Sequence, residues 1–352
     1  MDKVQETVSK IGLLDSDLMQ KAQGRLDNLT KPQGSLGRLE ELAKQIVGIT
    51  GDISPELKKK SIIIMTADHG VAVEGVSAYP REVTLQMVYN FLSGGAAINV
   101  LARHIGAEVL VVDMGVASDI KEHSLLVYKK VGYGTKNITE GPAMTDEQAL
   151  ESVQSGIEIA EMIIKKGYNI IGTGDMGIGN TTASSAIAAC ICKVNVESVT
   201  GYGTGINEKE LVKKINTIKK AISLNKPDNC NGFDVLAKIG GFEIGGIAGV
   251  ILGCAANKIP VVIDGFISGA GALIAAAIAP DSKNFMIASH SSVEKGHRIV
   301  LEKLRLKPLF NFDMRLGEGT GAALGINIAE ASVKILNEMA TFNQAGVSEK
   351  NE

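Results

Sequence analysis

From residue 61 onward, short and strongly apolar runs alternate with longer segments in which apolar residues recur at three- and four-residue spacing. The apolar runs are 61–67, 108–116, 169–173, 260–263 and 285–288. The longer helical segments are 83–104, 146–166, 181–192 and 291–304. Strands that alternate with helices are typical of right-handed crossover connections, which make neighbouring strands parallel. The pattern predicts an α/β fold, a Rossmann-like and mostly parallel sheet flanked by helices.

The two ends of the chain have helical patterns without such apolar runs. Apolar residues recur at helical spacing in the first 50 residues, and a last helical stretch covers about 321–339. We therefore expect one large α/β domain and a smaller helical part, formed by the N-terminal segment with or without the C-terminal helix. The expected boundaries are 1–60 for the N-terminal segment, 61–320 for the large domain, and 321–352 for the C-terminal helix and tail.

Charge and cysteine usage argue against several classes of protein. The 352 residues carry a net charge of −3, whereas a nucleic-acid-binding face needs a concentrated basic patch. The nearest approach to such a patch is a group of lysines that we interpret as a solvated helix face: Lys213, Lys214, Lys219 and Lys220. The four cysteines have neither disulfide-framework nor zinc spacing. We therefore predict no nucleic-acid partner, no metal site and reduced thiols.

Neither the N-terminus nor the apolar stretches indicate a membrane or export signal. The first residues, MDKVQETVSKIG, are polar and lack the apolar core of a signal peptide. The apolar stretches 240–256 and 261–279 contain Glu243 and Asp264, respectively. Such interruptions favour buried helices and strands over membrane spans. The sequence therefore predicts a cytoplasmic protein.

The residues that follow the apolar runs are the first candidates for a functional site. In open parallel sheets, ligands bind beyond the carboxyl ends of the strands. The candidate segments are 68–70, 113–115, 174–177, 264–266 and 289–292. Nearly all of them contain an acid, a glycine or a small hydroxyl, so we expect them to line one crevice.

Two glycine-rich segments are candidate phosphate sites. Residues 172–182, GTGDMGIGNTT, follow a predicted strand and open a predicted helix. Glycines let backbone N–H groups approach an anion, and a helix N-terminus adds free donors. A tight turn with capping residues explains the same pattern, so both interpretations stay open. The second segment, 201–205, is weaker alone, but Lys213 or Lys214 follows it and can supply positive charge.

Residues 289–297, SHSSVEKGH, also follow a predicted strand. Ser291 or Ser292 is expected either to cap the following helix or to donate to a phosphate. No third metal ligand lies near His290 and His297 in the sequence, so we expect structural or surface roles for both histidines.

Two further segments contain residues suited to an aromatic substrate. In RLGEGTGA, Glu318 stands between two glycines just before an alanine-rich helix. It is either a helix-capping acid or a general base whose pKa an apolar setting would raise. The loop 74–80 ends in Tyr79 and Pro80, which form either a flat wall against an aromatic ring or an ordinary proline turn.

Taken together, these segments closely resemble the nicotinate-nucleotide:dimethylbenzimidazole phosphoribosyltransferase family, over nearly the whole chain and in order. The matching segments are 31–40, 67–70, 74–80, 94–95, 99–101, 174–182, 232–241, 264–266, 289–296 and 315–321. The resemblance implies transfer of 5-phosphoribosyl from nicotinate mononucleotide to 5,6-dimethylbenzimidazole or a related base. The products would be α-ribazole 5′-phosphate and nicotinate, in the assembly of the cobamide (vitamin B12) nucleotide loop. It also implies a homodimer without a cofactor.

The resemblance assigns roles to individual residues. Glu318 matches the general base of the family. The aromatic-base pocket would contain Tyr79, Pro80, Met87 and Leu316. The phosphate and ribose contacts would be Asp175, Gly177, Asn180, Gly203, Lys214 and Ser292. The family usually has glutamate where this chain has Asp175, which is shorter by one methylene.

Other functions remain as alternatives. Residues 261–270 weakly resemble the loop of transferases that use phosphoribosyl diphosphate, but they carry one acid where those enzymes commonly have two adjacent ones. A dinucleotide-dependent oxidoreductase is less favoured, because no G-x-G-x-x-G follows the first strand. A nucleotide-binding sensor on the same fold, or an enzyme acting on purines or phenolic rings, also stays open.

Overall fold

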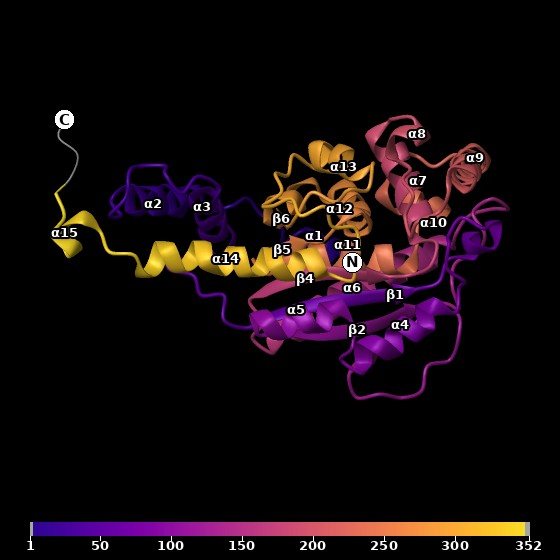
Figure 1. The fold of residues 1–352 in the computed structure, drawn as a ribbon, viewed down its shortest axis with the longest axis horizontal. Helices are drawn as coiled ribbons and strands as arrows, with labels where there is room; N and C mark the ends of the chain where they lie inside the picture. The colour runs from indigo at the N-terminus through magenta and orange to yellow at the C-terminus, as the bar shows by residue number, and fades with distance from the viewer. Residues whose placement is uncertain (1–2, 349–352) are drawn as a thin grey trace.

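The computed structural model describes residues 3–348, and its centre is a parallel sheet with helices on both faces (Figure 1). Within that range the sheet has six strands in the order β3-β2-β1-β4-β5-β6. The strands are β1 (Lys60–Ala67), β2 (Ala107–Gly115), β3 (Leu126–Tyr128), β4 (Ile170–Met176), β5 (Val261–Ile263) and β6 (Met286–Ala288). All pairs are parallel. The predicted α/β fold is confirmed, and the five apolar runs form five of these strands.

The order of the strands reverses between β1 and β4. From β1 the chain proceeds to β2 and β3 on one side, and then returns to add β4, β5 and β6 on the other. Beyond the carboxyl ends of such neighbouring strands, the connections diverge and leave a crevice for a ligand. The short strand β3 is not among the strands that the sequence predicts.

Alternation along β1 explains why the sheet is covered on both faces. Successive side chains of a strand point to opposite faces, and β1 is buried along its whole length. Ile63 and Met65 belong to the core beneath α6, α7, α11 and α12. Ile62 and Ile64 belong to the core beneath α4, α5 and α14. An uninterrupted apolar run is therefore what this central strand requires.

The helices that follow β1 include the four expected segments, with two differences. Their bounds are α4 (Val83–Leu92), α5 (Ala97–Ile105), α6 (Asp146–Lys165), α7 (Asn180–Cys192), α8 (Val196–Val199), α9 (Glu208–Asn225), α10 (Gly232–Ile239), α11 (Phe242–Ala256), α12 (Phe266–Ile278), α13 (His297–Leu304) and α14 (Thr320–Glu338). Short 3₁₀ turns are η1 (Gly70–Glu74) and η2 (Pro280–Phe285). The first difference is that segment 83–104 is two helices, because Gly94 has a left-handed φ of 76° between them.

The second difference concerns the segment 291–304, of which only α13 is helical. Residues 291–296 form a loop instead, because Ser291 N–H donates to the Phe310 carbonyl at 2.9 Å and Val293 N–H to the Met314 carbonyl at 3.2 Å. Gly296 occupies the N-cap position of α13. Of the two alternatives for Ser291 and Ser292, capping of the helix is therefore excluded.

A smaller helical group lies beyond the edge of the sheet. Helices α2 (Ser16–Asp27) and α3 (Arg38–Thr50) lie along the C-terminal half of α14 (Figure 1). They share a separate apolar cluster formed by Ala22, Leu26, Leu29, Ala43, Val47 and Leu336. The first half of α14 instead packs on the sheet through Ala322 and Ile326. One helix thus joins both groups, and domain boundaries at residues 60 and 320 stay a prediction.

The two ends of the described chain pack differently. Helix α1 (Lys3–Val8) packs against α6 and α11, and α15 (Phe342–Ala345) follows a bridge between Leu29 and Thr341. Of the predicted tail, residues 349–352 lie outside the described range. No helix within residues 3–348 is both long and apolar enough to cross a bilayer.

Candidate active site

The acidic residues at the strand ends separate into structural and candidate functional groups. Asp113 is fully buried, accepts from the Val116 N–H at 2.9 Å and lies 3.1 Å from the Lys130 ammonium. Asp113 therefore has a structural role at the end of β2. By contrast, Asp175 and Asp264 lie beside the turn that contains Glu318, as the following contacts describe.

Glu318 lies on a turn with unusual backbone geometry. Gly317, Glu318 and Gly319 have φ angles of 83°, 64° and 91°, all in the left-handed region. This conformation costs roughly 1–2 kcal/mol for a residue with a Cβ. The turn also lies directly against β4, since a Cβ on Gly174 would be 2.6 Å from the Glu318 carbonyl oxygen. Glycines on both sides, and on β4, allow the chain to present this one carboxylate.

The Glu318 carboxyl group is buried and incompletely paired. The side chain is 7% exposed, and its Oε2 has no hydrogen-bond partner among the residues that the structure describes. Burial raises its pKa above the ordinary value, and the charge of Asp264 adds to this effect. A backbone hydrogen bond from Ile98, at the N-terminus of α5, acts in the opposite direction. A carboxylate with a raised pKa is a better proton acceptor near neutral pH.

Asp264 fixes the Glu318 turn in place. Its Oδ2 accepts from the Gly319 N–H at 3.2 Å, and its Oδ1 accepts from the Ala322 N–H at 2.9 Å. It therefore satisfies free donors in the first turn of α14. Burial raises the pKa of Asp264 and lowers the pKa of the neighbouring His290. The residue assignments from the sequence miss this role, although the position of Asp264 at the end of β5 pointed to the crevice.

Asp175 is a second buried acid beside the same turn. A Cβ on Gly317 would be 3.3 Å from Asp175 Oδ2, so the turn lies against this side chain. Asn180 Nδ2 donates to the same oxygen at 3.1 Å, while Oδ1 has no partner within residues 3–348. Burial, followed by the charges of nearby acids including Asp264 and Glu318, raises the pKa of Asp175 well above its ordinary value. A neutral carboxyl group here can donate a hydrogen bond.

The glycine-rich turn after β4 is the candidate anion site. A Cβ on Gly177 would collide with the Ala67 carbonyl oxygen, so the close approach of β1 requires glycine at this position. Gly179, with a φ of 99°, precedes α7 without a side-chain cap. The Asn180 and Thr182 N–H groups donate to the Gly177 and Gly179 carbonyl oxygens at 3.1 and 2.9 Å, so the helix dipole is what favours negative charge there. Asn180 and Thr181 begin this helix.

Lys214 reaches the same surface from α9. Its side chain is 1% exposed, and its Nζ lies 2.7 Å from Thr181 Oγ1. A Cβ on Gly203 would be 3.1 Å from that Nζ. The structure therefore brings Lys214, Gly203 and the start of α7 together. The interpretation of Lys214 as part of a solvated face is wrong, because this position of α9 faces inward.

Burial perturbs the charges around Lys214. It lowers the pKa of the Lys214 ammonium to about 8. It raises the pKa of the Glu294 carboxyl, although Lys214 and Arg315 oppose that effect. Glu294 Oε2 has no partner in the described part of the chain. A buried cation with one hydroxyl partner has spare hydrogen-bonding capacity for an incoming phosphate.

Ser292 lies at the end of the loop after β6. Its N–H donates to His297 Nδ1 at 2.9 Å, and its Oγ accepts from the Glu294 N–H at 3.3 Å. Gly265, at the end of β5, faces it, since a Cβ there would be 4.0 Å from Ser292 Cβ. His290 and His297 are both buried, which excludes a surface role for either. Burial lowers the pKa of His297 to about 3, which keeps that ring neutral.

The residues predicted for an aromatic pocket differ in exposure. Tyr79 and Leu316 are 55% and 58% exposed, and Pro80 is also exposed. Met87 is partly buried and packs against the same core as Met176, the residue after Asp175. Helix α4, which carries Met87, is held against the glycine-rich turn after β4, because the Ile178 N–H donates to Thr84 Oγ1 at 3.1 Å.

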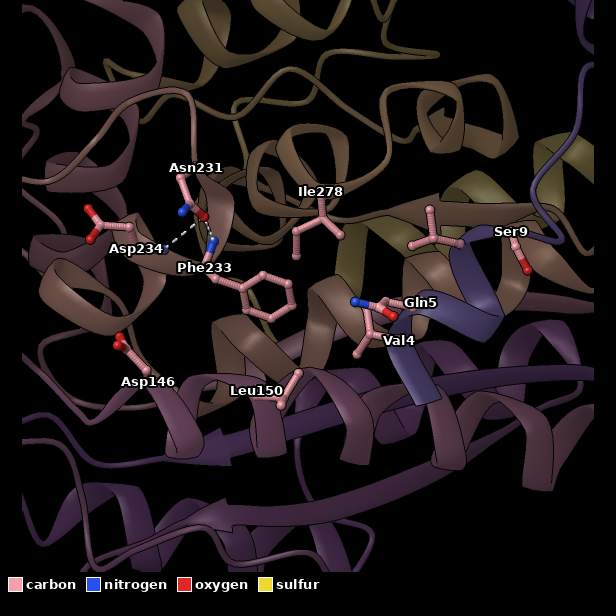
Figure 2. Close-up of a pocket in the computed structure, with 10 residues that line it drawn as sticks. Val4, Gln5, Ser9, Asp146, Leu150, Asn231, Phe233, Asp234 and Ile278 are labelled. Atoms are coloured by element: carbon pink, nitrogen blue, oxygen red, sulfur yellow. Dashed lines mark hydrogen bonds between the residues drawn. The ribbon is translucent and has the colours of Figure 1, made fainter. Parts of the chain in front are cut away.

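At least one concavity lies away from these residues. One cleft of about 670 Å³ is shown in Figure 2 and is lined by none of the predicted site residues. Its lining residues are Val4, Gln5, Val8, Ser9, Asp146, Leu150, Asn231, Phe233, Asp234 and Ile278. Asn231 Oδ1 caps α10 there by accepting from the N–H groups of Phe233 and Asp234. Among residues 3–348, no group of three His, Cys, Asp or Glu side chains is arranged to hold a metal ion.

The glycine-rich turn, the buried Lys214 and the adjacent carboxylates at the β1–β4 reversal fit the phosphoribosyltransferase class. Residues 11–347 match the family model whose description is "Phosphoribosyltransferase". The chain is 57% identical over 352 residues to the nicotinate-nucleotide–dimethylbenzimidazole phosphoribosyltransferase of Roseiflexus sp. (strain RS-1), covering 100% of both chains. It is 55% identical over 347 residues to the protein of that name from Geobacter metallireducens, covering 99% of this chain and 98% of that protein.

A solved structure agrees with these relatives. The crystal structure of the enzyme of that name from Thermus thermophilus superimposes with a TM-score of 0.91 at 43% identity. The match covers 96% of this chain and 100% of that one. The chain belongs to the nicotinate-nucleotide–dimethylbenzimidazole phosphoribosyltransferase family. The resemblance inferred from its motifs is therefore confirmed.

Proposed function

We propose that the chain transfers the 5-phosphoribosyl group of nicotinate mononucleotide to a ring nitrogen of 5,6-dimethylbenzimidazole or a related base, with Glu318 as the general base. The products are nicotinate and α-ribazole 5′-phosphate, which is used in the nucleotide loop of cobamides. Membership of the family supports the reaction. The observation that carries the assignment of the base is the buried, half-paired Glu318 carboxylate on its left-handed turn.

The donor phosphate is assigned to the surface around the start of α7. Gly177, Asn180 and Gly203 offer close backbone approach and polar contacts, and Lys214 supplies the positive charge. Ser292 adds a hydroxyl from the loop after β6. Phosphate contacts hold the ribose in a fixed position, which converts transfer into an effectively unimolecular step.

The acceptor ring is assigned to the side formed by Tyr79, Pro80, Met87 and Leu316. Exposed aromatic and aliphatic side chains suit the faces of a flat bicyclic ring. Glu318 removes the N–H proton of the ring, and the nitrogen's electron pair then attacks C1′ of the ribose. The bond from C1′ to nicotinate breaks at the same time, and attack from the opposite side inverts β to α.

The leaving group needs little assistance. The nicotinate ring is a cationic pyridinium in the donor, so the departing electron pair neutralises it. Burial raises the pKa of Asp175 and favours the protonated form of its carboxyl group, which suits it to donate a hydrogen bond to a ribose hydroxyl. Asp175 is shorter by one methylene than the glutamate that is usual in the family, so its contact with the ribose is part of this proposal.

We infer that the protein is a cytoplasmic homodimer, as the family resemblance implies. Light scattering coupled to gel filtration should give a mass twice that of the 37.0 kDa chain. A mass of a single chain at working concentration would contradict the dimer.

A nicotinate-release assay tests the reaction. Nicotinate mononucleotide is incubated with 5,6-dimethylbenzimidazole, benzimidazole, 5-methoxybenzimidazole, adenine or p-cresol, and the ribotide is identified by mass and NMR. Base-dependent release of nicotinate is expected. Measurable nucleotide binding without release for any base would instead favour the nucleotide sensor or another phosphoribosyl donor.

The Glu318→Gln variant tests the general base. Turnover should fall by roughly 10²–10⁴-fold, because a single proton-transfer group contributes about that much. Nucleotide binding measured by calorimetry should be unchanged. Glu302→Gln, a surface carboxylate in an exposed ion pair with Arg298, is the matched control. A Gln variant with wild-type turnover would refute the assignment.

A further inference from the structure

The segment Gly201–Gly205, between α8 and α9, contacts three parts of the proposed active site. Gly203 lies against the Lys214 ammonium, where the donor phosphate is assigned. The other two contacts join this segment to the acceptor side and to the turn that carries Glu318. We refer to these five residues as the coupling loop.

The first contact runs from Thr204 to the acceptor wall. Its Oγ1 accepts from the Ala78 N–H at 3.1 Å and lies 3.2 Å from Ser77 Oγ. Ser77 Oγ in turn accepts from the Tyr79 N–H at 3.3 Å. One hydroxyl group therefore fixes the backbone immediately before Tyr79, across 126 residues of sequence.

The second contact runs from Gly203 to the catalytic turn. Arg315 Nη1 donates to the Gly203 carbonyl oxygen at 3.1 Å. Arg315 precedes Glu318 by three residues, and Gly317 between them is already in the left-handed region. A guanidinium group bound at Gly203 therefore fixes the start of the turn that presents the Glu318 carboxylate.

We propose that Thr204 and Arg315 are positioning residues, through which the donor phosphate bound at the coupling loop organises both the acceptor wall and the Glu318 turn. The proposal rests on the proposed function, which places the phosphate beside Lys214 and Gly203. A phosphate that orders this loop removes conformational freedom that the acceptor would otherwise have to restrict on binding. The acceptor therefore binds more tightly once the phosphate is present, and by linkage the converse also holds.

Calorimetry on the full-length protein tests this coupling without turnover. The affinity for 5,6-dimethylbenzimidazole is measured alone and with saturating ribose 5-phosphate, which carries the phosphate but no leaving group. We expect ribose 5-phosphate to tighten acceptor binding by roughly fivefold or more, within the usual range for coupled sites. Thr204→Val, which keeps the shape but removes the hydroxyl, should abolish the increase, and Thr204→Ser should retain it.

The controls separate coupling from folding and from the proposed function. Thr50→Val makes the same substitution at the end of α3, where the hydroxyl bonds to its own helix and to Asp52, and should leave the increase intact. Arg315→Met should lower kcat more than it raises the KM for the donor, because it loosens the catalytic turn. Equal acceptor affinity with and without ribose 5-phosphate in the wild type, or an increase that survives in Thr204→Val, would overturn the coupling alone. No binding of either ligand to the wild type would overturn the proposed function and the coupling with it.

Discussion

Replacement of Lys214 by methionine should stabilise the free protein while weakening its binding of the donor. The Lys214 ammonium is buried, and the hydrogen bond that holds it is made to the Thr181 hydroxyl at 2.7 Å. Methionine has a similar length and needs no hydrogen bond. The free protein therefore bears a cost that only an anionic ligand offsets, as expected for a binding residue.

The lowered pKa gives the size of that cost. A fall from the ordinary 10.5 to about 8 corresponds to roughly 3 kcal/mol, since one pKa unit is about 1.36 kcal/mol. Loss of the donor to Thr181 opposes this by about 1 kcal/mol. We therefore expect Lys214→Met to raise the free energy of unfolding by about 2 kcal/mol at pH 7.

The contribution of Lys214 to stability depends on pH in a definite direction. Because the folded-state pKa of Lys214 is lower than the unfolded one, the unfolded chain binds more protons between about pH 8 and 10.5. The contribution of this residue to stability therefore rises with pH across that window. The advantage of Lys214→Met should be full below pH 8 and disappear as the pH approaches 10.5.

Urea unfolding of both proteins at pH 7 and pH 10, with donor binding measured by calorimetry, is the assay. Nicotinate mononucleotide should bind the variant about ten- to a hundredfold more weakly, the usual loss for a hydrogen bond to a charged group. Lys213→Met, at the adjacent exposed position, is the control and should change neither quantity. A variant that is less stable than the wild type at pH 7, or a stability difference independent of pH, would refute the reasoning.

The geometry of the site leads to three more expected outcomes. The apparent pKa of the acidic limb of the kcat/KM–pH profile should lie above the ordinary carboxylate range, because burial raises the pKa of Glu318. This limb should be absent from the pH profile of the residual activity of Glu318→Gln. Asp264→Ala should lower the free energy of unfolding by about 2 kcal/mol, because the first turn of α14 loses its cap. The same variant should lower kcat more than it lowers donor affinity. An unchanged kcat would contradict the role of Asp264 at the Glu318 turn. Gly177→Ala should destabilise the protein by about 1–3 kcal/mol in urea unfolding, because its Cβ would collide with the Ala67 carbonyl oxygen. It should also raise the KM for the donor. A wild-type KM would show that the turn can shift to accommodate the extra carbon.

Local patterns in the sequence were enough to predict the class of fold and the crevice to which the site is assigned. Apolar runs and helical spacing are local properties, so they report strands and helices without knowledge of what packs around them. The rule that ligands bind at the carboxyl ends of parallel strands then pointed to the edge where Glu318, Asp175 and Asp264 meet. The individual roles of Glu318, Lys214 and the other site residues came from the family resemblance and stay proposals.

Tertiary packing settled which of those residues are buried and what they contact. Lys214 belongs to a run of lysines, and the packing of α9 against α7 determines that this one faces inward. Ser292 lies in a loop and not at a helix start, because strand-like contacts with Phe310 and Met314 compete with helix formation. The contacts of Asp264 with α14 and of Thr204 with Ala78 join residues 55 to 126 positions apart. Such long-range hydrogen bonds leave no periodic signal in the sequence, so the fold alone reveals them.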